Sequence, residues 1–154
     1  LHIAVHAFGK ITLFMAAGAI YTAAHKTKVS ELAGIGRRMP WTMGAFAIGA
    51  ISMIGLPPAA GFLSKWYMLL GALEVEQWFA VGVIVGSTLL NAAYFLPIVY
   101  AAFLKPEKPD GHGHAHGEAP LPIVLALVTT GAATILLFLF PGPALELARM
   151  LVSQ

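Results

Sequence analysis

The chain has 154 residues, of which 58% are hydrophobic and only 10% are charged, whereas a soluble domain has about 25% charged residues. This composition excludes an ordinary soluble domain and predicts an integral membrane protein. The net charge is only +2, and because the basic residues form no stripe, they do not indicate a nucleic-acid partner. The chain has no cysteine, which excludes disulfides and cysteine-based metal or redox sites.

The first apolar stretch, 2–24, has the length of one membrane span, since a span needs about 20 apolar residues. It starts without a methionine or the charged region of a signal peptide, so we expect a C-terminal fragment of a longer protein. His2, His6 and Lys10 stand four residues apart. Each step of four rotates a helix by only about 40°, so the three side chains form one polar stripe.

The stripe favours a proton relay, because ionisable groups inside a membrane normally face protein or water and are often functional. Histidine titrates near neutral pH and can pass protons on. A lysine that is withdrawn from water disfavours its charged form, so Lys10 could alternate between two protonation states. The alternative is that Lys10 lies near a helix end and snorkels to the membrane surface.

The second apolar stretch, 41–73, is too long for one straight span and contains the segment "GLPPAAGFLSKW". Pro57, Pro58 and Gly61 predict a helix break near 57–64. The stretch could be a hairpin of two short helices, or one span that is interrupted and then continues.

Loop charge favours the interrupted span. Lys and Arg occur in the loops 25–40 and 105–120, whereas the connection 74–77 has none. An interrupted span places both basic loops on one face of the membrane, as the positive-inside rule requires of cytoplasmic loops. A hairpin would place Lys105 and Lys108 outside.

Lys65 is the second cation expected within the membrane. Unwound backbone at membrane depth is tolerated where protein or water satisfies it, and transporters use such breaks beside their ion pathways. We therefore interpret Lys65 as a titratable site beside a hydrated helix break. The alternative is a lysine in a surface loop between two short helices.

The remaining spans are expected at 78–104 and 121–140, followed by a short interfacial helix at 144–152. Asn91 lies midway in the third span, where it could hydrogen-bond a neighbouring helix or hold pathway water. His112, His114 and His116 are interpreted as a solvated loop rather than a metal site, since no further ligand fixes a geometry. No cofactor motif is present. The expected fold is an all-α polytopic transmembrane helix bundle with one discontinuous helix, in one membrane domain over 1–154.

Three segments, "HAFGKITLF", "GIGRRMP" and "GLPPAAGFLSKW", resemble the C-terminal part of the proton-translocating antiporter-like membrane proteins. That family includes the large subunits of Mrp-type multisubunit Na+/H+ antiporters and the antiporter-like subunits of respiratory complex I and of membrane-bound hydrogenases. The resemblance extends to about Leu104. The wording of "RRMPWTMGAFAIGA" and "SKWYMLLGA" is most similar to the D-type large subunit of the bacterial Mrp-type antiporters.

The resemblance implies that the chain holds the last four of about fourteen transmembrane helices, and that the first of two inverted repeats is missing. It implies that Lys10 and Lys65 match the two lysines of the proton path in this half, with His2 and His6 beside them. The function implied is that of an ion-translocating subunit, and not itself an enzyme, in the inner cell membrane. Its partners would be other membrane subunits, protons, and Na+ or K+. A redox-driven pump subunit and a non-conducting structural piece remain the alternatives.

Overall fold

The structure is a computed structural model that describes residues 1–106 and 117–152, with side chains as far as residue 150. The predicted loop histidines His112, His114 and His116 lie outside the described residues. Every regular element in the described ranges is a helix, which confirms the all-α fold class. The elements are α1 (His2–Ala24), η1 (Val29–Glu31), η2 (Ile35–Arg37), α2 (Pro40–Ile54), α3 (Ala60–Glu74), α4 (Trp78–Leu104), α5 (Leu121–Leu139) and α6 (Gly142–Val152).

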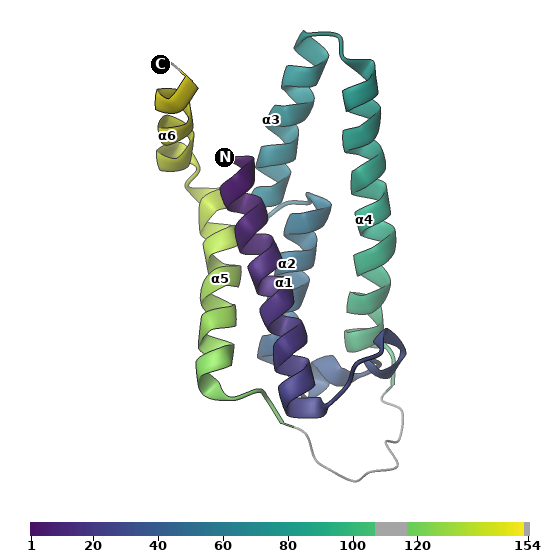
Figure 1. The fold of residues 1–154 in the computed structure, drawn as a ribbon. Coiled ribbons are helices and arrows are strands. Elements are labelled where there is room, and N and C mark those ends of the chain that lie inside the picture. The colour runs from purple at the N-terminus through teal and green to yellow at the C-terminus, as the bar shows by residue number, and fades with distance from the viewer. Residues whose placement is uncertain (107–116, 153–154) are drawn as a thin grey trace.

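Three of the described helices, α1, α4 and α5, are long and apolar enough to cross a membrane. The other two helices of the bundle, α2 and α3, have 15 residues each, too few for a separate span at about 1.5 Å per residue. In Figure 1, α2 and α3 follow one another in the same direction, and α4 returns beside them. The segments that follow α1 and precede α5 lie at one end of the bundle, and the α3–α4 turn lies at the other.

The interruption between α2 and α3 covers residues 55–59 and is shorter than the predicted break. Gly55 ends α2 with a φ of 88°, a left-handed conformation that glycine adopts without steric cost. Pro57 and Pro58 follow within the non-helical segment, and the peptide bond between them is cis. Neither proline has a backbone N–H group, so neither can donate the hydrogen bond that would continue the helix.

The sequence pattern predicts that Gly61 helps to break the helix, and this prediction is wrong, because Gly61 lies in the first turn of α3. The structure gives another reason for a glycine at this position. A Cβ atom at this position would fall on the backbone carbonyl oxygen of Ser52 in α2. The missing side chain therefore allows the start of α3 to lie directly against the last turn of α2.

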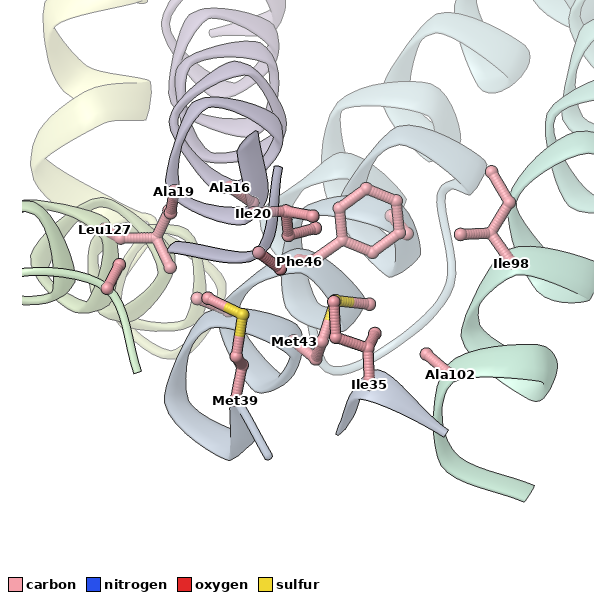
Figure 2. Packing of buried hydrophobic residues seen from close by; sticks show 14 of the residues in the cluster. Ala16, Ala19, Ile20, Ile35, Met39, Met43, Phe46, Ile98, Ala102 and Leu127 are labelled. Atoms are coloured by element: carbon pink, nitrogen blue, oxygen red, sulfur yellow. The ribbon is translucent and has the colours of Figure 1, made fainter. Parts of the chain in front are cut away.

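The core surrounds α2. Figure 2 shows side chains of α1, α4 and α5 meeting the methionines and Phe46 at the start of α2. Met39 and Met43 are completely buried. Small residues let the helices approach one another closely. A Cβ on Gly49, for example, would lie 3.3 Å from Thr12 of α1.

The N-terminus of α2 is closed by a residue from a distant part of the chain. Pro40 occupies the first helical turn, and the preceding residue gives no side-chain cap. Instead, the Glu118 carboxylate accepts hydrogen bonds from the backbone N–H of Trp41 (2.6 Å) and the hydroxyl of Thr42 (2.7 Å). A carboxylate is favourable there because a helix N-terminus carries partial positive charge and free N–H groups.

Candidate functional site

Lys65 reaches back from the second turn of α3 across the helix interruption. Its Nζ atom donates hydrogen bonds to the backbone carbonyl oxygens of Met53 (3.1 Å) and Ile54 (2.9 Å). It also donates to the hydroxyl of Thr88 in α4, at 3.1 Å. An ammonium group has three hydrogens to donate, so these contacts account for all of them.

The partners of Lys65 combine a favourable dipole with the absence of a full negative charge. The carbonyls of Met53 and Ile54 end α2, where their hydrogen-bonding capacity is free and the helix dipole is negative. All three acceptors are neutral oxygen atoms. The interruption therefore creates the acceptors that hold the lysine, which joins the predicted break to the predicted cation.

Asn91 belongs to the same cluster. Its Nδ2 atom donates to the carbonyl oxygen of Met53 at 3.4 Å, so two side chains converge on one carbonyl. Thr88 is a site residue that the sequence analysis missed. The signal that could have pointed to it is its position three residues before Asn91, because residues at i and i+3 share a helix face.

His2 and His6, on α1, line a space that Lys65 also lines but Thr88 does not. Their ring centroids are 5.5 Å apart, as expected for residues one turn apart. His2 Nδ1 lies 3.1 Å from the hydroxyl of Ser64, which donates to the carbonyl of Gly61 at 3.1 Å. Ser64 is the residue before Lys65, so the histidine pair contacts the same part of α3 that carries the lysine.

A small cavity connects these groups. Its volume is about 20 Å³, and both histidines, Ser52, Ser64 and Lys65 contribute to its walls. A cavity of roughly 10–15 Å³ or more can hold one water molecule when two to four polar partners are present. The cavity meets both conditions, so a single water molecule fits between the histidine pair and the lysine.

Lys65 also lines a larger, open pocket of about 190 Å³ between α3 and α4. Gly55, Trp66 and Thr88 contribute to its lining, and Lys65 is the residue that it shares with the small cavity. Lys65 thus lies between two separate spaces.

The structure does not bring Lys10 into this cluster. Lys10 is exposed on α1 and lines a third pocket, of about 370 Å³, which also touches α2, α4 and the segment after α1. The walls of this pocket are mainly apolar, with Lys26 and Lys28 at its other end. The predicted stripe is therefore divided, with His2 and His6 in one space and Lys10 in another.

The fold and the cluster together define a class, a polytopic membrane helix bundle whose interrupted helix holds a lysine at the break. Within that class, the chain belongs to the NADH:quinone oxidoreductase/Mrp antiporter transmembrane family, whose model matches residues 1–91. The matched residues include His2, His6, Lys10, Lys65 and the helix interruption. The family resemblance noted in the sequence is confirmed.

The similar proteins include both kinds that the family name covers, NADH-quinone oxidoreductase subunits and an Mrp complex. The NADH-quinone oxidoreductase subunit N of Desulforudis audaxviator is 49% identical over 105 residues, which cover 68% of this chain and 21% of that protein. A chain of the Mrp complex from Dietzia sp. DQ12-45-1b has the same fold, with a TM-score of 0.83 and 22% identity over 93% of this chain. A chain of respiratory complex I from Thermus thermophilus aligns with a TM-score of 0.65 and 25% identity over 90% of this chain.

The chain is short compared with these proteins. It spans 21% of the length of the Desulforudis relative and 34% and 33% of the two solved chains. The comparisons therefore concern one part of larger membrane proteins.

Proposed function

We propose that the chain is part of an ion-translocating membrane subunit of a multisubunit monovalent cation/proton antiporter. Protons would move along water and the side chains of Lys10, His2, His6 and Lys65, of which the last three are half-buried, in exchange for Na+ or K+. The observation that carries this proposal is the position of Lys65, a half-buried lysine held by neutral oxygens at the interruption of α2 and α3. Such a lysine can lose its proton without breaking an ion pair.

The order of the groups supports a path. His2 and His6 border the small cavity, the cavity has room for one water molecule, and Lys65 closes its far side. The open pocket beside Thr88 continues beyond Lys65. Lys10 borders the pocket on the other side of the histidines. We propose that protons pass from the Lys10 pocket to the histidine cavity and from there past Lys65 into the open pocket, or along the same path in reverse.

An antiporter-like subunit of a redox-driven pump, such as respiratory complex I, is the second candidate. The 49% identity with a protein named NADH-quinone oxidoreductase subunit N favours it, whereas the resemblance of "SKWYMLLGA" to the D-type large subunit of Mrp antiporters favours the antiporter. The two candidates differ in what drives transport. Proton movement that follows an imposed Na+ or K+ gradient indicates the antiporter, and movement that requires electron transfer to quinone indicates the pump.

The partners and location follow from the same proposal. Other membrane subunits of the complex would cover the apolar surface of the bundle, where many large side chains, including Phe79 and Leu90, are exposed. The location would be the inner cell membrane. The subunit itself would transport ions without catalysing a chemical reaction.

The substitution Lys65→Met tests the proposal. Methionine keeps the length and most of the apolar volume of lysine but has no titratable group. In the assembled complex, reconstituted in vesicles, we expect normal assembly and a near-complete loss of proton transport. The same change at Lys105, which is exposed just after α4 and lines none of the three spaces of the proposed path, is the matched control and should leave transport near the wild-type rate. Normal transport with Lys65→Met would support a non-conducting role for this part of the subunit.

A further inference from the structure

Neighbouring spaces along the proposed path have a single lining residue in common. The pocket of Lys10 and the small histidine cavity have one lining residue in common, and that residue is Met53. The histidine cavity and the open pocket beside Thr88 likewise share only Lys65. The residue shared by the second pair of spaces is therefore a titratable lysine, whereas the residue shared by the first pair has an apolar thioether side chain.

The side chain of Met53 lies against α1 between the two spaces. The Cβ position of Gly9 is 3.2 Å from its Sδ atom and 3.5 Å from its Cγ atom. Gly9 comes directly before Lys10 and three residues after His6, so Met53 covers the stretch of α1 that separates the cavity histidine from the pocket lysine. Because Gly9 has no side chain, Met53 supplies the nearest bulk at this crossing, with the hydroxyl oxygen of Ser52 next at 3.7 Å from the same Cβ position.

The backbone of the same residue is fixed. The carbonyl oxygen of Met53 accepts from both Lys65 and Asn91. A methionine side chain has three rotatable bonds and adapts its shape easily. The arrangement therefore combines an anchored main chain with a side chain that is able to change rotamer.

We propose that the Met53 side chain is a hydrophobic gate between the Lys10 pocket and the histidine cavity. In the structure it divides the two spaces. A change of rotamer away from Gly9 joins them, so that water connects Lys10 with His6. This inference rests on the proposed function, and it adds a residue that controls when the two halves of the path are in contact.

Two opposite substitutions test the gate in the assembled complex. Met53→Ala removes the barrier, so the passive proton leak of vesicles should rise about tenfold, which corresponds to lowering a barrier by about 1.4 kcal/mol. Gly9→Ala adds a methyl group 3.2 Å from the sulfur, which hinders rotation, so coupled transport should fall without a leak. Met53→Leu keeps an apolar side chain of similar size and should not leak.

The matched control is Met43→Ala, the same change in the same helix at a residue that is completely buried in the core. It should lower stability without raising the leak. A second readout does not depend on transport: modification of His6, which lines the histidine cavity and neither of the other two spaces, by a small water-soluble imidazole reagent, followed by mass spectrometry. We expect Met53→Ala to accelerate it relative to Met43→Ala, because water then reaches the cavity from the Lys10 pocket.

An unchanged leak together with unchanged His6 modification in Met53→Ala would overturn the gate. So would an equal leak in Met43→Ala, which would assign the effect to lost packing. These outcomes are distinct from a failure of the proposed function, which would appear as normal transport in Lys65→Met whatever the behaviour of Met53.

Discussion

Lys65 is held by groups that have no charge of their own. Removing its proton leaves two carbonyls and a hydroxyl, all of which can bond to water or to other donors. With a carboxylate partner, the same step would leave an uncompensated negative charge in a region of low dielectric. The neutral acceptors therefore suit a lysine that changes its protonation state, whereas a carboxylate would hold it permanently charged.

Thr88 should matter because it is the one side-chain acceptor of Lys65 among the described residues. It donates to the carbonyl of Ile84 at 3.0 Å and accepts from Lys65. Thr88→Val keeps the shape but removes the acceptor, and a hydrogen bond to a charged group contributes about 1.5–3 kcal/mol. We expect proton transport in vesicles to fall by roughly tenfold, and Thr88→Ser to restore most of it.

The control for this prediction is Thr129→Val. Thr129 is exposed on α5 and its hydroxyl donates to the carbonyl of Leu125 in its own helix. An equal loss of transport in both variants, or none in Thr88→Val, would remove Thr88 from the site.

At the scale of elements, α2 has a charged partner at each end. The Glu118 carboxylate binds its N-terminal N–H groups, and the Lys65 ammonium binds its C-terminal carbonyls. Each charge has the sign that the helix dipole favours. The short helix is thus fixed in position by two other elements, the segment before α5 and the start of α3.

The contact of α3 with α2 should depend on the glycine at position 61 and not on the other glycine of α3, Gly71. Gly61→Ala places a methyl group on the Ser52 carbonyl, and overpacking of this kind typically costs about 1–3 kcal/mol or more. Gly71→Ala changes the same helix where no atom lies within 4 Å of the added methyl group, and alanine is favoured over glycine in a helix by about 1 kcal/mol. We expect Gly61→Ala to reduce the yield and thermal stability of the assembled complex, and Gly71→Ala to preserve both. Similar behaviour of the two variants would refute the close contact.

Much of this arrangement could be predicted from local sequence. Two adjacent prolines favour a helix interruption, and a lysine early in the following helix has the free carbonyls of the preceding one within reach, so Lys65 and the break could be linked in advance. The partners from distant elements could not. Thr88, Met53 and Glu118 are ordinary residues in their own segments, and only helix packing places them beside Lys65, Gly9 and the start of α2. The prediction for Gly61 failed because the reason for its glycine lies in Ser52, on another helix.

At the scale of the whole molecule, the bundle has two unlike ends. The basic segments around Lys26 and Arg37 leave α1 at one end, and the acidic turn with Glu74 and Glu76 joins α3 to α4 at the other (Figure 1). The positive-inside rule then assigns the first end to the cytoplasm. This orientation is a prediction, because it follows from the loop charges alone.

Cysteine labelling tests the orientation, because these 154 residues contain no cysteine. We introduce single cysteines at Ser30, Gly117 and Gln77, which are all exposed. In right-side-out vesicles an impermeant thiol reagent should label only the cysteine at Gln77, and permeabilised vesicles should allow labelling of all three. Opposite behaviour of Ser30 and Gly117 would mean that the two segments lie on different sides of the membrane.

The central claim is that Lys65 works by alternating between its charged and neutral forms, and Lys65→Arg tests it most directly. Arginine preserves the positive charge and the ability to donate to carbonyls, but its guanidinium group does not lose its proton in proteins. The measurement is proton uptake by the assembled complex over a range of pH. We predict that Lys65→Arg assembles normally and fails to transport protons at every pH. Wild-type uptake with arginine at this position would contradict the account, because a fixed positive charge would then be sufficient.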